Sequence, residues 1–288
     1  MPRLLRSVDD LTEEDVDAVL AAAARPVVRS AGAGGPLVGL IFLEASLRTR
    51  VGFAAAAARL GGGHVEVGDR RHSPTSMGES LADTIATVSD YTDVVVVRPG
   101  VPLDPTAVAE VGCPVVNGGD AGPAAEHPTQ ALIDLFALQR VAGDVADLTV
   151  AVCGDLRMRA ARSLLKLLGR RPPAHLVVIT DDALLDPSDP VIGGLPAAAF
   201  RQPDEVEDVD VLYVAGMPHE ALALPARERL IVDDETLRRL PSHAVVLSPM
   251  PVIDEIAPAA RRDRRMAYRR QSGDGLAVRA AVLEHLSG

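Results

Sequence analysis

The residues best suited to chemistry stand where an apolar segment changes into a helix pattern. The segment 38–44 has the apolar character of a strand, and a helix pattern begins a few residues later. Ser46, Arg48 and Thr49 occupy this change. The first N–H groups of a helix carry partial positive charge, and hydroxyl and guanidinium groups supply further donors. These residues indicate a site for an oxyanion such as phosphate, although a Ser46 N-cap beside surface arginines is an equally good interpretation of this stretch alone.

Two further junctions carry donors of the same kind. Arg98 ends an apolar run, where a charge is expected only if it faces a ligand or a paired carboxylate. His127 and Gln130 stand at the start of another helix pattern. Taken one at a time, a surface arginine and a His-Pro helix cap explain them. Together the three junctions, with no competing nucleophile triad, predict a site that holds an oxyanion and polarises a carbonyl group.

The elements that would position these donors alternate between short β-branched strands and helices. The candidate strands are 94–98, 148–155, 175–180, 209–216 and 244–249, and the candidate helices begin at Arg48, Glu79, Thr129 and Arg159. This alternation predicts an α/β fold with parallel sheets and binding sites at the carboxyl ends of strands. The Gly- and Pro-rich segment 115–130 interrupts the pattern, so we expect two α/β domains joined near residue 130.

The composition argues against several classes of partner. The formal net charge of −11 repels nucleic acid and anionic membrane surfaces, so we expect neither as a partner. No stretch has the apolar length of a signal peptide core or a membrane span, which predicts a cytoplasmic protein. Cys113 and Cys153 lie in apolar runs without nearby histidines, so we expect core thiols, with neither a disulfide nor a zinc site.

Three other features argue against further kinds of site or activity. The segment 260–270 is rich in arginine, but it is short and interrupted by Asp263, which favours a solvated loop or strand flank. The segment 152–160 lacks the glycine pattern of a dinucleotide site, which argues against an oxidoreductase. His219 follows a strand pattern, and we expect it to be a surface residue.

Several of these stretches together resemble one enzyme family, the aspartate and ornithine carbamoyltransferases. The resemblance extends over nearly the whole chain and includes the segment 274–279. It favours the aspartate branch through VNGGD at 116–120 and PVIDEIA at 251–257. The stretches that carry it, in the family's order and approximate spacing, are Ser46-Leu47-Arg48-Thr49-Arg50, Gly78 to Thr84, Arg98-Pro99, His127 to Leu132 and Ser248-Pro249-Met250-Pro251.

The resemblance implies a two-domain α/β transferase of pyrimidine biosynthesis. Residues 1–130 would bind carbamoyl phosphate and be joined by a C-terminal helix at about 274–288, and residues 131–273 would bind the acceptor amino acid. Each domain would have a parallel sheet flanked by helices. The family forms homotrimers with active sites shared between subunits and uses no metal or organic cofactor. A regulatory chain or a pathway enzyme as a further partner is left open.

The resemblance also assigns roles to individual residues. The catalytic donors would be Arg48, Thr49, Arg98 and His127. Glu44 would pair with arginines when the domains close. The expected ligands of carbamoyl phosphate are Ser46, Leu47 through its backbone, Arg48, Thr49, Arg98, His127, Gln130, and Ser73 from a neighbouring subunit. The expected acceptor-binding residues are Arg159, Pro249 and Met250.

The chain also departs from the family pattern. Leu47 replaces a threonine and Met77 an interface lysine. Gly216 replaces an acceptor-binding arginine, Pro218 replaces a glutamine, and the family's His-Pro-Leu-Pro-Arg becomes Ser-Pro-Met-Pro-Val at 248–252. Since a hydrogen bond to a charged group contributes roughly 1.5 to 3 kcal/mol, losing two cationic contacts weakens aspartate binding about a hundredfold or more.

Two hypotheses follow from these matches and departures. The first is a carbamoyltransferase that acts on aspartate or, as the departures favour, on a different amino-acid-like amine with one carboxylate bound by Arg159. The second is a non-catalytic homologue that serves as a trimeric scaffold or assembly partner, which the changes at Leu47, Met77 and Gly216 would suit. Because the donors at three junctions are retained while the changes concentrate elsewhere, the sequence favours the enzyme.

Overall fold

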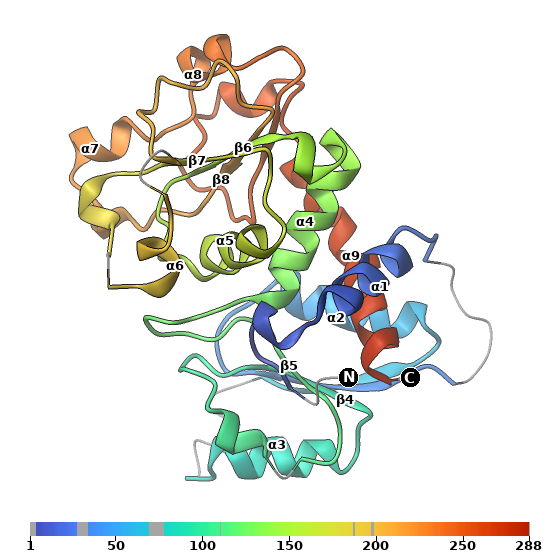
Figure 1. The fold of residues 1–288 in the computed structure, drawn as a ribbon. Coiled ribbons are helices and arrows are strands. Elements are labelled where there is room, and N and C mark those ends of the chain that lie inside the picture. The colour runs from blue at the N-terminus through green and yellow to red at the C-terminus, as the bar shows by residue number, and fades with distance from the viewer. Residues whose placement is uncertain are drawn as a thin grey trace. The chain divides into compact units, whose positions relative to one another are not determined.

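The protein is described by a computed structural model that covers residues 4–27, 34–68, 78–109, 111–186, 188–196 and 199–287. The chain divides into two compact units, Met1–Ile133 with Asp274–Gly288, and Asp134–Gly273 (Figure 1). Each unit contains one parallel sheet flanked by helices, and the C-terminal helix belongs to the first unit, which confirms the predicted fold class. The sequence analysis placed the boundary between the two domains at residue 130, and the first segment of the first unit ends at Ile133. The substrates of the two units remain predictions.

The first unit is built on a five-stranded sheet with the order β1-β5-β4-β2-β3, in which every pairing is parallel. Its strands are β1 Leu4–Leu5, β2 Leu37–Phe42, β3 Gly63–Val67, β4 Val94–Arg98 and β5 Val115–Asn117. Its helices are α1 Glu13–Ala23, α2 Arg48–Arg59, α3 Leu81–Ser89, the start of α4 Pro128–Ala142 and most of α9 Tyr268–Ser287. All five residues of β4 are buried, as its unbroken apolar run predicts.

The second unit has a four-stranded parallel sheet in the order β7-β6-β8-β9. Its strands are β6 Thr149–Cys153, β7 His175–Ile179, β8 Val211–Val214 and β9 Val245–Leu247. Its helices are α5 Arg159–Arg170, α6 Pro190–Gly193, α7 Leu224–Glu228 and α8 Asp234–Arg239. Short 3₁₀ turns in the two units lie at Val8–Asp10, Pro105–Val108, Val145–Asp147, Asp182–Leu184, His219–Ala221 and Ala260–Arg262.

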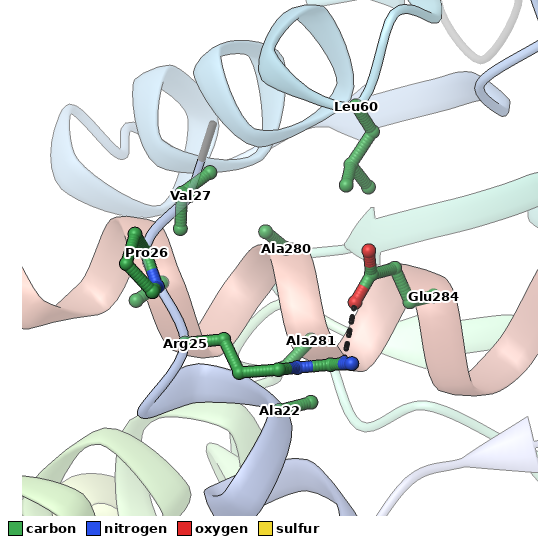
Figure 2. Close-up of a pocket in the computed structure, with 9 residues that line it drawn as sticks. Ala22, Arg25, Pro26, Val27, Leu60, Ala280, Ala281 and Glu284 are labelled. Carbon is green, nitrogen blue, oxygen red and sulfur yellow. Dashed lines mark ion pairs between the residues drawn. The ribbon is translucent and has the colours of Figure 1, made fainter. Parts of the chain in front are cut away.

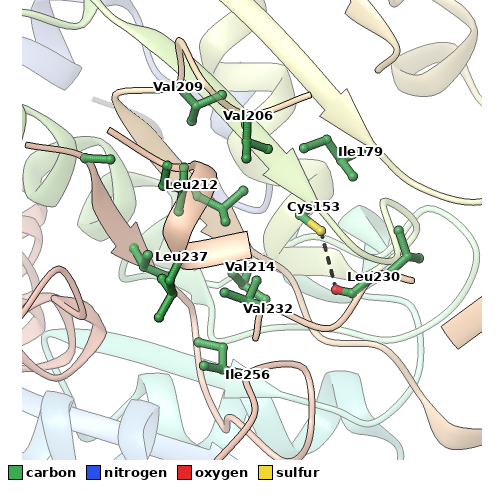
Figure 3. Close-up of a cluster of buried hydrophobic side chains, with 14 of the residues drawn as sticks. Cys153, Ile179, Val206, Val209, Leu212, Val214, Leu230, Val232, Leu237 and Ile256 are labelled. Carbon is green, nitrogen blue, oxygen red and sulfur yellow. Dashed lines mark hydrogen bonds between the residues drawn. The ribbon is translucent and has the colours of Figure 1, made fainter. Parts of the chain in front are cut away.

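Apolar side chains fill the space beside each sheet. Figure 3 shows the cluster of the second unit, where Leu212 and Val214 of β8 lie near Leu237 and Ile256. Cys153 belongs to this cluster, and burial raises the pKa of its thiol to about 12. Cys113 is also buried and unbridged, so the prediction of two core thiols is confirmed.

Helix α9 is attached to the first unit along a face rich in alanine. Figure 2 shows a small pocket between the end of α1 and α9, where Ala280 and Ala281 form one wall. Arg25 extends across this wall to Glu284, with Nη2 3.5 Å from the carboxylate oxygen. Within the described part of the chain, no helix has both the length and the apolar character needed to cross a membrane.

A buried polar network in the second unit connects α4, α9 and the segment that follows β9. The Tyr213 hydroxyl donates to one carboxylate oxygen of Asp134 at 2.7 Å, and the Gln271 side-chain amide donates to the other at 2.6 Å. The N–H of Ser248 donates to the Gln271 side-chain carbonyl at 2.8 Å. Burial raises the pKa of Tyr213, so its hydroxyl remains a donor at neutral pH. The network thus fixes the backbone at Ser248, where the acceptor site is expected.

Asp134→Ala is expected to lower the free energy of unfolding by about 3 kcal/mol, because it leaves two buried donors without their acceptor. Urea unfolding followed by circular dichroism measures this change. Asp134→Asn keeps one acceptor oxygen and is expected to cost about 1 kcal/mol. Equal losses for the two variants would contradict the assigned network.

Candidate active site

The N-terminus of α2 is the centre of the first candidate site. β2 ends at Phe42, and α2 begins at Arg48 with Leu47 in the N-cap position. No side chain caps this helix within the described part of the chain, so the alternative interpretation of Ser46 as an N-cap is wrong. The side chain of Leu47 is 69% exposed and leaves the helix end uncovered. The first-turn N–H groups therefore remain available for an anion.

Arg48 has an unusual environment for a cation. Its side chain is half-buried, and burial lowers its pKa. In the described ranges it makes no hydrogen bond and no ion pair with a carboxylate, whereas its neighbour Arg50 pairs with Glu66 at 2.7 Å. A partly desolvated guanidinium is stabilised by an opposite charge. This environment of Arg48 favours an anion beside its guanidinium.

The predicted polarising donors lie next to one another beside this helix end. Thr49 Oγ1 is 3.2 Å from His127 Nε2, and both side chains are buried. Gly119 separates His127 from Arg98, because a Cβ atom at Gly119 would lie 2.9 Å from His127 Cδ2 and 3.1 Å from Arg98 Nη1. The structure thus gathers Thr49, Arg98 and His127 from three junctions that are distant in sequence.

Arg98 is buried and oriented from two sides. Its Nη2 donates to Glu44 Oε1 at 2.9 Å, and its Nη1 approaches the Gly118 carbonyl at 3.4 Å. The sequence allowed Arg98 either a paired carboxylate or a ligand, and the structure shows the paired carboxylate. The proposed role of Glu44 in domain closure stays a prediction. Gln130 lies in the first turn of α4, where its N–H donates to the His127 carbonyl at 2.9 Å.

The loop that carries His127 is held by two residues to which the sequence analysis gave no role. Asn117 is fully buried, and its Oδ1 accepts from the N–H of Gly119 at 2.9 Å while its Nδ2 donates to the Glu126 carbonyl at 3.3 Å. Asp120 Oδ1 accepts from the N–H of Glu126 at 2.8 Å. The residue types of VNGGD gave a signal, since Asn, Gly and Asp favour turns stabilised by side-chain hydrogen bonds. These bonds fix the backbone that presents His127.

Gly119→Ala is expected to weaken carbamoyl phosphate binding about tenfold, because the new methyl group would displace His127 and Arg98. The φ of +102° at this residue also favours glycine. Calorimetric titration with carbamoyl phosphate measures the effect. Gly112→Ala is the control, since a Cβ there meets no atom within 4 Å. Equal affinities for the two variants would contradict the close approach at Gly119.

Two residues of the interface loop, Ser73 and Met77, lie outside the described residues. Their expected contribution from a neighbouring subunit is untested. Ser46 and Leu47 lie at the N-terminal end of α2 as predicted, and their contacts with substrate stay a prediction.

The second candidate site lies at the carboxyl edge of the sheet in the second unit. Arg159 is the first residue of α5, which follows β6. Gly216 follows the neighbouring strand β8, and Pro249 and Met250 follow β9. Because the strands are parallel and adjacent, the three junctions lie along one edge. Met250 has a φ of 57° and is partly buried against the apolar cluster of this unit.

Gly216 has space for a side chain. Its backbone lies outside the left-handed region, and a Cβ atom would meet only Met158 Cε, at 3.5 Å. The terminal methyl group of Met158 thus lies beside the position where the resemblance implies an arginine in the family.

Other cations near this edge are held by carboxylates. Arg157 donates to both oxygens of Asp155, each at 2.9 Å, and this pairing raises the pKa of Arg157. Arg227 is buried, donates to both oxygens of Asp254, and also donates to the Pro218 carbonyl at 2.9 Å. Arg227 therefore ties the loop after β8 to the loop after β9, a role that the sequence analysis missed.

His219 is not a replacement for the missing arginine in this structure. Its side chain is 67% exposed, and Nδ1 lies 3.5 Å from Asp254 Oδ2. The expectation of a surface histidine is confirmed.

Comparison with known proteins gives the family that the sequence resembles. A family model for aspartate/ornithine carbamoyltransferase, carbamoyl-P binding domain, matches residues 3–140. The aspartate carbamoyltransferase catalytic subunit of Finegoldia magna is 33% identical over 306 residues, which cover 99% of this chain and 98% of the relative. The catalytic subunit of Archaeoglobus fulgidus is 33% identical over 303 residues, which cover 99% of each chain.

Solved structures show the same relationship. The catalytic subunit of M. Jannaschii aspartate transcarbamoylase has a TM-score of 0.84 at 28% identity, covering 99% of this chain and 98% of that one. The Trypanosoma cruzi aspartate transcarbamoylase in complex with carbamoyl phosphate and aspartate has a TM-score of 0.84 at 30% identity, covering 98% and 94%. With relatives of this identity matched along almost its full length, the chain belongs to the aspartate/ornithine carbamoyltransferase family.

Proposed function

We propose that the protein transfers the carbamoyl group of carbamoyl phosphate to the amine of an amino-acid-like acceptor, and that aspartate is a poor acceptor. The observation that carries the transferase proposal is the uncapped helix end at Arg48 beside the buried group of Thr49, Arg98 and His127. Membership of a carbamoyltransferase family supports it. The structural relative from Trypanosoma cruzi is known in complex with carbamoyl phosphate and aspartate.

In the proposed reaction the amine attacks the carbonyl carbon, negative charge accumulates on the carbonyl oxygen, and phosphate leaves. Arg48 and the first-turn N–H groups of α2, with the Ser46 hydroxyl, would hold the leaving phosphate. Thr49, Arg98 and His127 would donate to the carbonyl oxygen, and Gln130 would accept from the carbamoyl amide. A preorganised donor of this kind contributes about 3 kcal/mol to lowering the barrier.

Positioning supplies the remaining part of the proposed rate enhancement. Holding the amine beside carbamoyl phosphate removes on the order of 7 kcal/mol of entropic cost. Arg98 would exchange part of its pairing with Glu44 for a contact with substrate. The proposal includes a homotrimer in which Ser73 of a neighbouring subunit completes the phosphate site, and it involves no metal or organic cofactor.

The acceptor part of the proposal depends on the edge around Gly216. An acceptor with one carboxylate would bind Arg159, with Pro249 and Met250 beside it. A second carboxylate would meet the thioether of Met158 where the family pattern has an arginine. Burying an unpaired carboxylate against apolar groups is unfavourable, so a monocarboxylate is the better ligand.

The acceptor proposal is tested by measuring kcat/KM for a panel of amines at saturating carbamoyl phosphate. We expect α-amino monocarboxylates with uncharged side chains to exceed aspartate by about a hundredfold. A preference for aspartate would overturn the acceptor assignment and leave the transferase proposal intact. Absence of turnover with every amine, together with normal binding of carbamoyl phosphate, would support the non-catalytic alternative.

A further inference from the structure

We propose that a pocket at the amino end of β9 binds the phosphate group of a small phosphate ester. The pocket has a volume of about 320 Å³ and lies wholly within the second unit. It is bounded by the last turn of α4, the turn that precedes β9, and the residues that lead into α9. Its polar lining consists of Ser242, His243, Arg264, Arg265 and Arg270.

This pocket is separate from both candidate sites described above. His243 and Val245 lie at the start of β9, whereas Pro249 and Met250 follow its carboxyl end. A strand rises about 3.3 Å per residue. The pocket and the acceptor site therefore lie at opposite ends of β9, roughly 10 Å or more apart. The carbamoyl phosphate cradle belongs to the first unit. The inference therefore does not depend on the proposed transferase activity.

The lining of the pocket is positively charged in a chain whose net charge is −11. It contains three arginines, and none of its residues is an aspartate or a glutamate, while its one histidine, His243, is paired with Asp210. The nearest acid along the chain is Asp263, and its charge is taken up by Arg265, which donates to it through Nε and Nη2 at 2.9 Å each. These hydrogen bonds lower the pKa of Asp263 to about 2, so the pair stays ionised at neutral pH.

The Arg265 side chain forms one wall of the pocket and is held in place by hydrogen bonds, so we do not expect it to bind the ligand directly. Its Nη1 donates to the carbonyls of Leu237 at 2.7 Å and Leu240 at 3.0 Å. The sequence analysis expected a solvated loop or strand flank at 260–270, and Met266 does form a bridge to Val246 of β9. The Arg265 side chain is largely buried, and its guanidinium organises the surrounding backbone. Ordered walls lower the entropic cost of binding a ligand.

Two other arginines have donors available. Arg264 uses Nη2 to donate to the Ser242 carbonyl at 3.1 Å, which orients the guanidinium at the pocket. Arg270 makes no hydrogen bond or ion pair with any residue of the described ranges. His243 Nε2 is held 2.8 Å from Asp210 Oδ1, which positions its ring. A planar guanidinium with several unused N–H groups matches the geometry of a phosphate.

The start of α9 adds donors in the same place. Ala267 lines the pocket, and α9 begins at the next residue, Tyr268. Its first hydrogen bond from the main chain runs from Gln271 N to the Ala267 carbonyl at 3.0 Å. In the described part of the chain the N–H groups of residues 268–270 have no such partner and carry partial positive charge, whereas the N–H of Ala267 donates to the Val246 carbonyl at 2.9 Å. The helix end thus reinforces the arginine cluster and favours a dianion over a monoanion.

The volume of the pocket indicates the size of the ligand. About 320 Å³ lies at the lower end of the range of small-molecule sites, which is more than a bare phosphate ion needs. Val141 and Ala244 supply an apolar part of the wall. A phosphate ester with a compact organic group would use both the basic and the apolar surfaces.

The test is calorimetric titration of the full chain with ribose 5-phosphate and, separately, with inorganic phosphate. Both titrations use the Arg48→Ala protein, so that the first-unit cradle does not contribute. We expect one site for ribose 5-phosphate, at least about fivefold tighter than inorganic phosphate, with an affinity that falls as salt is added. Equal affinities would overturn the assignment to an ester, and absence of binding at millimolar concentration would overturn the site.

Matched arginine variants locate the binding. Arg264→Gln and Arg270→Gln, made singly in the same background, are each expected to weaken binding about tenfold. Arg269→Gln removes the same charge one residue from Arg270, but Arg269 does not line the pocket, and we expect less than about a twofold change. A loss at Arg269 equal to that at Arg270 would show general surface attraction and overturn the pocket.

Discussion

Arg48→Ala is expected to reduce carbamoyl transfer about a thousandfold, because it removes the guanidinium at the uncapped end of α2. Arg48 is half-buried without a carboxylate partner in the described part of the chain. Its removal therefore breaks no stabilising ion pair, and the loss of activity would not result from unfolding. Calorimetric titration is expected to show carbamoyl phosphate binding weakened by at least about a hundredfold. The folding of the variant is checked by its thermal unfolding midpoint, which we expect to be unchanged or raised.

The matched control is Arg50→Ala, two residues further along the same helix. Arg50 is paired with Glu66 at the surface, and an exposed ion pair contributes about 0 to 1 kcal/mol. We expect Arg50→Ala to change carbamoyl phosphate affinity less than about threefold. Similar losses in both variants would mean that net positive charge, and not the geometry at Arg48, determines binding.

Gly216→Arg is expected to raise kcat/KM for aspartate at least about tenfold. The substitution introduces a cation at the position where the resemblance implies an acceptor-binding arginine. The backbone at Gly216 accepts a side chain without strain, and among the described residues a Cβ would meet only the flexible end of Met158, at 3.5 Å. The measurement is the initial rate of aspartate carbamoylation at saturating carbamoyl phosphate.

Gly216→Met is the control for this variant. It fills the same space without charge, and we expect it to leave the rate with aspartate unchanged or lower. If both substitutions had the same effect, the missing charge at residue 216 would not be what limits aspartate.

The sequence predicted those parts of the fold that local patterns encode. The apolar run at 94–98 is β4, and the donor-rich junction at Arg48 is the start of α2, because hydrophobic runs and helix starts are properties of neighbouring residues. The short strands β1, β3 and β5 were not predicted, and β5 lies at the start of the segment 115–130, which was expected to interrupt the strand pattern. β3 is exposed along most of its length, so it lacks the apolar signal of a buried strand.

The contacts that organise the sites were harder to predict. The pairing of Arg98 with Glu44 joins residues 54 positions apart, and that of Arg227 with Asp254 joins residues 27 apart. No periodicity in the sequence connects such pairs, since only the fold brings them together. The arginine-rich segment 260–270 shows the same limit, because its role depends on the turn before β9 that lies beside it.

The central claim is that the chain transfers a carbamoyl group with the donors around Arg48. The most direct measurement is release of phosphate from isotopically labelled carbamoyl phosphate, with and without the amine panel, together with mass spectrometry of the products. We predict amine-dependent phosphate release and a labelled ureido product in equal amounts, both lost in Arg48→Ala. Phosphate release that does not depend on any amine, or no labelled product from a protein that binds carbamoyl phosphate, would contradict the account.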